Sequence, residues 1–424
     1  MFFDMFKPIE LMAPVGSYES LMAAINAGTD SVYFGVEQLN MRACSANNFT
    51  LEDLKKIASI CKKNGVKFYL TLNTVLYDHD ISLMKDICKA AKNAEIDAVI
   101  VSDMAAIQYA RSLGLKVHIS TQVNISNIES VKFYAQFSDV VVLARELTLK
   151  QIKNICEEIK SYDIRGSSGD LVKVEIFVHG ALCIAISGKC YMSLATYNAS
   201  ANRGACLQNC RRAYRVIDEE TGDELVIDNK YVMSPKDLCT IGFIDKILDA
   251  GVSVLKIEGR GRKEDYVHVV VKSYREAINS YLLGTYNKEK IDRWTKDLES
   301  VYNRGFWQGG YYLGKKLGEW SGDYGSQSTK EKILVGKVKN YFMKSHVAYF
   351  NLNGGSLKEG DEILVTGPTT GVVESRVSSI YKDDNKIFFA SKGTDVTVPL
   401  PIKVRAGDKL YILIQRANGK NSLL

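Results

Sequence analysis

The stretch that decides the fold is TLEDLKKIASICKKNGVKFYLTLN, from Thr50 to Asn73. Its first part places apolar residues three and four positions apart, at Leu54, Ile57 and Cys61, which is the spacing of one buried helix face. Gly65 ends the helical pattern. The following run, KFYLTLN, is short and apolar, as is typical of a buried β-strand. The stretch is therefore one helix–strand unit of an α/β fold.

Units of this kind recur through the first 285 residues. Eight strand-like runs stand out: IELMAP (9–14), SVYFGV (31–36), KFYLTLN (67–73), DAVIVSD (97–103), KVHIST (116–121), DVVVLAR (139–145), KVEIFVHG (173–180) and SVLKIEG (253–259). Amphipathic helical patterns such as SLMAAINAG and DISLMKDICKAAKNAE lie between them. An open doubly wound sheet is the alternative, but no G-x-G-x-x-G follows the first strand, and eight units favour closure. The sequence therefore predicts a (β/α)8 TIM-like barrel over residues 1–285.

The rest of the chain has a different pattern. A connector of helical and Gly/aromatic segments, 286–330, is followed by short alternating runs such as SHVAYFNLNG and GDEILVTGP, split by Gly, Asp and Asn. This pattern predicts a small C-terminal antiparallel β-barrel domain over 331–424. That segment holds 14 Lys and Arg against 9 Asp and Glu, so it carries most of the net charge of +6. A basic domain is compatible with RNA contact, although a domain with a Lys-rich face is the commoner explanation.

The chain gives no sign of export or membrane insertion. Its start, MFFDMFKPIELMAP, lacks the basic region, long apolar run and cleavage site of a signal peptide. No apolar stretch reaches the length that a membrane helix needs. We therefore expect a cytoplasmic protein with no membrane partner. In a reducing compartment, a cluster of cysteines favours metal binding or catalysis over disulfides.

Five of the nine cysteines gather in one insertion, over 180–240, which follows the seventh predicted strand. They are Cys183, Cys190, Cys206, Cys210 and Cys239, with six, fifteen, three and twenty-eight residues between successive members. Loops that leave the carboxyl ends of barrel strands build active sites, so the insertion belongs at the barrel mouth. An iron–sulfur cluster with four Cys ligands fits this spacing better than structural zinc, whose C-x2-C or C-x4-C pairs are absent. A nucleophilic cysteine with His179 as its base is a third possibility, but it leaves most of the thiols unused.

Polar residues at the ends of several predicted strands complete a candidate pocket. They include Arg145, His179, Glu258 and Arg260, and Arg203, Arg211 and Arg212 lie close to Cys206 and Cys210. Positive charge beside the thiols suits an anionic substrate or a cluster, although each residue by itself is equally typical of a solvated loop.

The run EIFVHGALCIAISGKC resembles the signature of the collagenase-like peptidase family U32. The matching positions are Glu175, Phe177, Gly180, Cys183, Gly188 and Cys190. The likeness extends to ELMAPVGSYESLMAAINAGTDSVYFG, LNMRACSANNFT, SPKDLC and LKIEGR, so it covers nearly the whole chain. Despite the family's name, its better-understood members act in tRNA and ribosomal-RNA hydroxylation, and this chain resembles the TrhP-type tRNA hydroxylation proteins.

The resemblance implies a TIM-like barrel, a [4Fe-4S] cluster, and hydroxylation without molecular oxygen, with prephenate as the oxygen donor. By position, Cys183, Cys190 and Cys206 match cluster ligands. Cys239 is the expected fourth ligand, with Cys210 as its alternative. The implied reaction is 5-hydroxyuridine formation at the tRNA wobble position, with tRNA, and a paired homologue, as candidate partners.

The positions of the polar residues at the predicted barrel mouth, and not the resemblance, suggest their roles. We expect catalytic roles for His179, Glu258 and Arg145, and cofactor-binding roles for Arg203 and Arg260. Two other functions stay open. One is a collagenase-like peptidase, although H-E-x-x-H and G-x-S-x-G are absent from the sequence. The other is a non-catalytic RNA-binding module whose cluster is structural.

Overall fold

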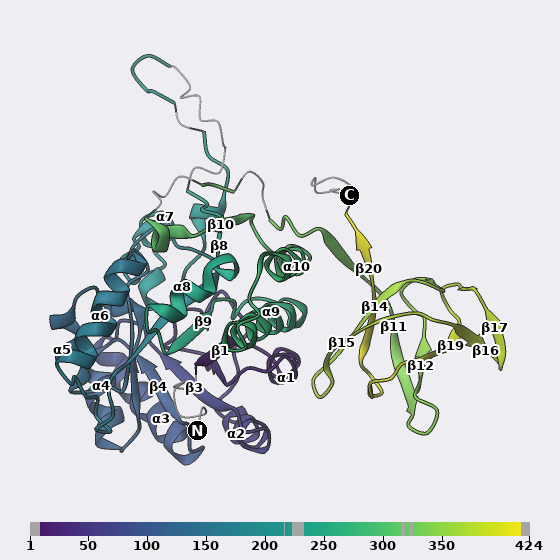
Figure 1. The fold of residues 1–424 in the computed structure, drawn as a ribbon, viewed down its shortest axis with the longest axis horizontal. Coiled ribbons are helices and arrows are strands. Elements are labelled where there is room, and N and C mark those ends of the chain that lie inside the picture. The colour runs from purple at the N-terminus through teal and green to yellow at the C-terminus, as the bar shows by residue number, and fades with distance from the viewer. Residues whose placement is uncertain (1–8, 216, 223–232, 315–318, 322–324, 417–424) are drawn as a thin grey trace.

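The computed structural model describes residues 9–215, 217–222, 233–314, 319–321 and 325–416. Parts of the predicted insertion and connector, at 216, 223–232, 315–318 and 322–324, lie outside the described residues. Figure 1 shows a strand barrel surrounded by helices, with an all-β lobe beside it.

Eight parallel strands form the barrel. They are β1 (Glu10–Pro14), β2 (Ser31–Phe34), β3 (Lys67–Leu72), β4 (Ala98–Val101), β5 (Val117–Ile119), β6 (Val140–Val142), β7 (Lys173–Gly180) and β9 (Val254–Ile257). From β1 to β7 each strand pairs with the next, and the ring closes because β9 pairs with both β7 and β1. All eight strands fall within the predicted runs, so the predicted (β/α)8 barrel is confirmed.

Helices cover the outside of this barrel. They are α1 (Tyr18–Asn26), α2 (Asp53–Lys63), α3 (Ile81–Asn93), α4 (Met104–Ser112), α5 (Ile128–Ala135), α6 (Leu149–Ser161), α8 (Ile244–Asp249) and α9 (Glu264–Leu282). Helix α2 shows how the sequence sets the packing, since Leu54, Ile57 and Cys61 form its buried face. Gly65 then adopts a left-handed φ of +66°, which lets the chain turn from the helix into β3.

An additional short strand lies between β7 and β9 in the sequence, and the pattern of residues did not predict it. Strand β8 (Asp237–Cys239) runs antiparallel to the end of β7, with Cys239 opposite His179 and Leu238 opposite Gly180. Its other edge pairs with β10 (Phe306–Gln308). The described part of the insertion therefore starts and ends at the carboxyl end of β7.

The C-terminal lobe is an antiparallel sheet with its own apolar core. Its strands are β11 (Lys330–Phe342), β12 (Val347–Asn351), β14 (Glu362–Gly367), β15 (Gly371–Arg376), β16 (Ile380–Lys382), β17 (Asn385–Ile387), β19 (Asp395–Pro399) and β20 (Lys409–Gln415), with β13 (Leu357–Lys358) and β18 (Phe389–Ala390) forming a separate pair. Among the described strands, the edge strands β15 and β17 do not pair with each other, so the sheet curls without closing. The predicted antiparallel β structure is confirmed, and the domain boundaries at 285 and 330 stay predictions.

The two lobes are in contact through α1 and α9. Ala23 of α1 packs against Leu364 and Val372 of the C-terminal lobe. The side-chain amide of Asn26 donates a 3.0 Å hydrogen bond to the carbonyl oxygen of Thr370. This packing positions the C-terminal lobe against the outer helices of the barrel.

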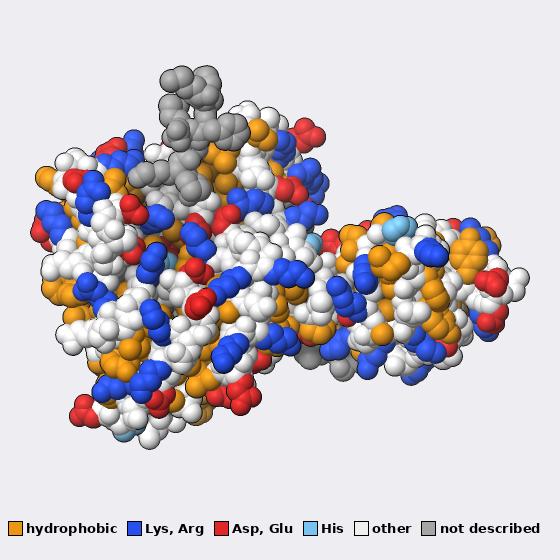
Figure 2. Space-filling view, turned by 90° about the horizontal axis from the view of Figure 1, so that it is seen from below, with side chains coloured by type: hydrophobic (Ala, Val, Ile, Leu, Met, Phe, Trp, Pro, Cys, Tyr) orange, Lys and Arg blue, Asp and Glu red, His pale blue; other side chains and the backbone are white. Residues whose placement is uncertain are grey.

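Charged side chains are spread over both lobes. Lys332 pairs with Glu264 and Asp265 at the start of α9, at 3.0 Å from each carboxylate. On the face seen in Figure 2, Lys and Arg side chains are scattered over the barrel as well as the C-terminal lobe. Within the described part of the chain, no helix has the length and apolar character needed to cross a membrane.

We predict that Phe350→Ala lowers the free energy of unfolding of the C-terminal lobe by about 3–5 kcal/mol, because the fully buried Phe350 ring fills its core. Phe388 is 72% exposed and provides the matched control, since Phe388→Ala should change that free energy by less than about 0.5 kcal/mol. Urea unfolding followed by circular dichroism checks both variants. Equal effects of the two substitutions would contradict the assignment of this core.

Candidate active site

A pocket of about 220 Å³ lies at the carboxyl ends of the barrel strands. Asn73, Arg145 and Glu258, which directly or closely follow β3, β6 and β9, line it from the barrel side. The insertion contributes further lining residues between positions 181 and 211. The pocket is therefore at the end of the barrel where this fold builds active sites.

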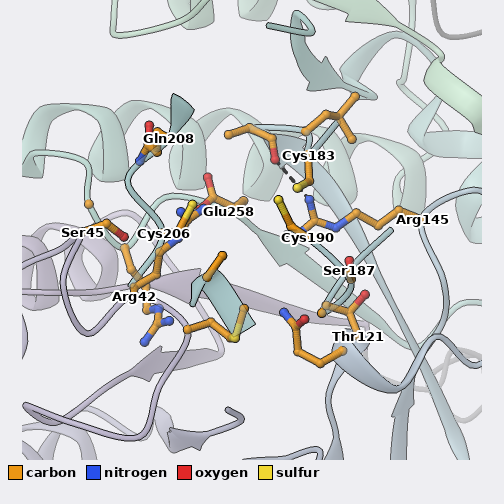
Figure 3. A pocket seen from close by; sticks show the side chains of 18 of the residues that line it. Arg42, Ser45, Thr121, Arg145, Cys183, Ser187, Cys190, Cys206, Gln208 and Glu258 are labelled. Carbon is orange, nitrogen blue, oxygen red and sulfur yellow. Dashed lines mark hydrogen bonds and ion pairs between the residues drawn. The ribbon is translucent and has the colours of Figure 1, made fainter. Parts of the chain in front are cut away.

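Four of the five clustered cysteines line this pocket. They are Cys183, Cys190, Cys206 and Cys210. Figure 3 shows the first three of these side chains directed into the same space, although they come from separate parts of the insertion. The short helix α7 (Met192–Tyr197) and two 3-10 turns fold the insertion so that its thiols converge.

Cys239, the expected fourth ligand, is placed elsewhere. It belongs to β8, is 2% exposed and does not line the pocket. Burial raises the pKa of its thiol to about 12, and its side chain contacts the hydroxyl of Tyr274. Of the four cysteines expected as ligands, three therefore line the pocket, and the fourth thiol there belongs to Cys210.

The four pocket thiols influence one another electrostatically. Burial raises the pKa of Cys190, and the charges of Cys183 and Cys206 raise it further. Burial also raises the pKa of Cys210, with the other three thiols adding to the effect and Arg211 opposing it. Four thiolates in this space therefore need a cation between them.

The spacing of the pocket thiols distinguishes a single-ion zinc site from an iron–sulfur cluster site. Among the described residues, no three His, Cys, Asp or Glu side chains are close enough together to hold one ion. A structural zinc ion needs all four thiolates within about 2.3 Å of a single centre. A [4Fe-4S] cluster offers each thiolate a different iron and so suits thiols that share a pocket at wider spacing. The donor set fits the cluster better than zinc.

The rest of the lining is strongly cationic. Six arginines line the pocket, and Glu258 is the one acidic residue among its described lining residues. The arginines are Arg42, Arg145, Arg211, Arg260, Arg262 and Arg304. Guanidinium groups bind carboxylates and phosphates through paired charge-assisted hydrogen bonds, so this lining favours an anionic ligand.

Glu258 is held in its ionised form by these arginines. Its carboxylate accepts a 2.8 Å hydrogen bond from Nη2 of Arg42. Burial by itself raises the pKa of Glu258, but Arg42, Arg262 and Arg145 outweigh this and hold the pKa at about 2. At neutral pH Glu258 is therefore a fixed acceptor and a weak base.

Arg145 and Arg260, both predicted site residues, reach the pocket in different ways. Arg145 lies over the ring of Phe177 at 4.1 Å and donates to the carbonyl oxygen of Ala181 at 3.2 Å. Its Nε is buried without a partner among the described atoms, which leaves a donor for a ligand. Arg260 donates to Asn40, in the loop after β2, at 2.9 Å and to Thr71 of β3 at 2.8 Å, and burial lowers its pKa to about 10. Arg260 is thus anchored to the barrel wall.

His179 and Arg203 do not line the pocket. The His179 ring lies among aromatic rings, with Nδ1 3.4 Å from the hydroxyl of Tyr274, and burial lowers its pKa to about 3. Arg203 pairs with Asp80 at 2.7 Å and lies over the ring of Tyr77 at 3.9 Å. His179 is therefore a buried neutral residue, and Arg203 lies outside the pocket.

Three of the pocket arginines were missed from the sequence. Arg42 is part of LNMRACSANNFT and Arg262 follows Arg260 by two residues, so the motifs contained a signal for both. Arg304 comes from the connector, far from any motif. Only the fold brings Arg304 to the pocket.

Several buried polar atoms at the pocket have no partner among the described residues. They are Oγ of Ser45, Oγ1 of Thr121, Oε1 of Gln122, Nε of Arg145 and Oδ1 of Asn209. Buried polar atoms are almost always hydrogen-bonded, so these five atoms point to water or a ligand in the pocket.

We predict that Arg42→Gln raises the pKa of Glu258, because a strong opposing charge is lost while burial remains. In the folded protein the pKa of Glu258 is about 2, below its ordinary value of 4.5. Ionised Glu258 therefore stabilises the folded state above pH 4.5. This stabilisation disappears as the pH falls towards 2. The difference in free energy of unfolding between wild type and Arg42→Gln should therefore grow by about 1–3 kcal/mol from pH 2 to pH 5. Urea titrations across this range measure it.

Lys63→Gln, which removes an exposed charge from α2, is the control and should give a difference that does not change with pH. A pH-independent difference for Arg42→Gln as well would contradict the coupling between Arg42 and Glu258.

Comparison with known proteins identifies relatives with two kinds of name. The family model for peptidase family U32 matches residues 16–322. A Porphyromonas gingivalis protein named collagenase is 57% identical over 402 residues, covering 95% of this chain and 97% of that protein. The Bacillus subtilis tRNA hydroxylation protein P1 is 31% identical over 428 residues, covering 98% and 96%. An Escherichia coli 23S rRNA 5-hydroxycytidine synthase is 33% identical over 278 residues, covering 65% of this chain and 40% of that protein.

The matched region contains the barrel from α1 onwards, the insertion and every residue that lines the pocket. The chain therefore belongs to peptidase family U32, as its sequence motifs predicted.

Proposed function

We propose that this chain is an iron–sulfur-dependent RNA hydroxylase that forms 5-hydroxyuridine at the wobble position of tRNA without molecular oxygen, using prephenate as the oxygen donor. The observation that carries the proposal is that four cysteines and six arginines line one pocket. Relatives named for tRNA hydroxylation and for 5-hydroxycytidine in rRNA support an RNA substrate. A paired homologue as a further partner stays a prediction.

The proposed cluster ligands are Cys183, Cys190, Cys206 and Cys210, because a [4Fe-4S] cluster takes four cysteine thiolates. When bound, the cluster would supply a redox-active iron centre. Burial raises the pKa of Cys210, but Arg211 partly offsets this and so favours the thiolate. Cys239 lacks such an arginine among the charges that shift its pKa, and its thiol stays protonated in the core.

The arginines are proposed to bind the carboxylates of prephenate. Arg145 and Arg211 donate only to carbonyl and hydroxyl oxygens within the described contacts, so neither guanidinium is hydrogen-bonded to an acidic side chain. Arg42 is already paired with Glu258 and serves mainly to orient that carboxylate. Arg145 and Arg211 are therefore the arginines best suited to hold a dicarboxylate.

Glu258 is proposed to orient the substrate. With a pKa of about 2 it stays ionised and accepts hydrogen bonds from N–H or O–H groups, but it takes up no proton at neutral pH. His179 is not proposed as a proton carrier, because it lies outside the pocket lining and has a pKa of about 3. The proposal thus gives Glu258 and Arg145 binding and orienting roles.

A collagenase-like peptidase is the second candidate, because the relative that is 57% identical is named collagenase. A thiol peptidase needs a base within hydrogen-bonding distance of its nucleophile. Among the described residues, no histidine lines the pocket that contains Cys183. Gelatin cleavage by iron-free protein that disappears in Cys183→Ser would support the peptidase over the hydroxylase.

We predict that protein purified without air contains about four iron and four acid-labile sulfide ions per chain. Cys210→Ser should lose most of this content, whereas Cys239→Ser should retain it. Cys61→Ala, on the buried face of α2, is a control for general effects of losing a thiol. Elemental analysis with an absorption spectrum measures all three. Zinc in place of iron would contradict the proposed cofactor. Loss of iron from Cys239→Ser but not from Cys210→Ser would favour Cys239 as the fourth ligand, as expected from the sequence.

A second prediction concerns the RNA. Transfer RNA from a strain that lacks this gene should contain no 5-hydroxyuridine. The wild-type gene should restore the modification, whereas a gene for Cys183→Ser should not, because that variant removes a proposed cluster ligand. Mass spectrometry of tRNA nucleosides measures the modification. Unchanged tRNA in the deletion strain, or full restoration by Cys183→Ser, would contradict the proposed function.

A further inference from the structure

The insertion has an unusual charge composition where it surrounds the pocket. We call residues 180–215 the insertion rim. It contains five basic residues, Lys189, Arg203, Arg211, Arg212 and Arg215, and no Asp or Glu. All of it lies within the described part of the chain. A run of this length without an acid contributes net positive charge to the mouth of the pocket.

Two of these cations are open to solvent and unpaired. Lys189 and Arg212 are exposed, and within the described contacts neither forms an ion pair with an acid; Arg212 donates a hydrogen bond to the hydroxyl of Tyr197. Lys189 lies next to Cys190, and Arg212 lies next to Arg211, both of which line the pocket. The two charges therefore lie at the rim of the pocket, where a polyanion can reach them.

Exposed aromatic rings accompany these cations. Tyr191 is 68% exposed and Tyr197 is 44% exposed, and the guanidinium of Arg212 is 5.2 Å from the centre of the Tyr197 ring. Single exposed aromatic residues are ordinary, but here they stand beside unpaired cations at the entrance of a pocket. Aromatic faces next to positive charge form the stacking platforms that bind single-stranded nucleic acid.

A third aromatic ring completes the entrance from the barrel side. Tyr77, in the loop after β3, is 53% exposed and is covered on one face by Arg203 of the insertion rim at 3.9 Å. The backbone N–H of Val75 donates to the carbonyl oxygen of Asn202 at 3.1 Å, which holds this loop against the rim. Asn202 lines the pocket, so the Tyr77–Arg203 pair lies directly beside it.

From these observations we propose that the insertion rim is the RNA-binding surface and that it binds the unpaired nucleotides on either side of the modified base. Bases stack on Tyr191 and Tyr197, while Lys189 and Arg212 contact phosphates. This inference rests on the proposed function and specifies which part of the chain recognises the RNA.

The position of the pocket supports single-stranded RNA as the occupant of the rim. The pocket is lined on all sides by barrel and insertion residues and excludes a duplex, so the target nucleotide must leave its stack to enter. Neighbouring bases that have lost their stacking partner gain new ones on exposed tyrosines. A collagen-like peptide has no comparable need for an acid-free basic surface.

The first experiment measures binding of the full-length protein, purified without air, to an RNA hairpin with a uridine-containing loop. Tyr197→Ala and Tyr191→Ala should each weaken binding by roughly 5- to 150-fold, the effect of losing one base–aromatic stack. Tyr162→Ala is the matched control, because Tyr162 is 63% exposed at the end of α6, and it should bind the hairpin as the wild type does.

The second experiment measures how binding depends on salt. The double variant Lys189→Gln/Arg212→Gln should reduce the slope of log binding constant against log salt concentration by roughly 1.4, because two phosphate contacts with single-stranded RNA are lost. Lys63→Gln/Lys92→Gln is the control of equal charge change. Lys63 and Lys92 lie in the last turns of α2 and α3, at the end of the barrel opposite the mouth.

Iron content is measured for every variant, because Tyr191 and Lys189 adjoin a proposed ligand, whereas Tyr197 does not. A Tyr197→Ala protein that has normal iron content but binds the RNA hairpin more weakly than the wild type supports the inference. The rim assignment would be overturned if the wild type binds the hairpin and the rim variants bind it with the same affinity and the same salt slope. That result would leave the proposed function intact. A wild-type protein that binds no RNA but cleaves gelatin would overturn both.

Discussion

The pairing of β7 with β9 is the constraint on which the site depends. Strand β9 closes the barrel by pairing with β7 on one edge and β1 on the other, although the whole insertion separates β7 from β9 in the sequence. The two strands approach closely at Gly180, whose φ is +106° and where a Cβ atom would lie 2.5 Å from the carbonyl oxygen of Glu258. Only glycine fits there, and this approach brings Glu258 next to the start of the insertion.

The interior of the barrel contains charges that an apolar core would exclude. Lys256 and Glu175 form a 2.7 Å ion pair with almost no exposure to solvent. Burial lowers the pKa of Lys256 and raises that of Glu175. A buried pair of this kind contributes little net stability, since removing two charges from water costs about as much as their attraction returns. Its effect here is to fix Lys256, and with it the end of β9, at the floor of a cationic pocket.

Much of the barrel could be predicted from the sequence, because its strands are continuous apolar runs and its helices have a regular buried face. The exceptions depend on long-range pairing. Strand β8 has only three residues and exists because both of its edges find partners. The position of His179 was also unpredictable. Alternation along β7 would place it on the same side as Glu175 and Phe177, but a register shift between Phe177 and His179 redirects the side chain.

The cysteines illustrate the same limit, and they also bear on the chemistry. Spacing indicates how many thiols are available but not which segments turn towards the pocket, so Cys210 and Cys239 could not be separated from the sequence. A peptidase needs one thiol with a lowered pKa, whereas burial raises the pKa of both Cys190 and Cys210. Thiols with raised pKa values, as at Cys190 and Cys210, are poor nucleophiles, yet they become good ligands when a metal centre displaces their protons. The shared pocket therefore favours thiols that act together over a thiol that acts alone, whichever name a relative has been given.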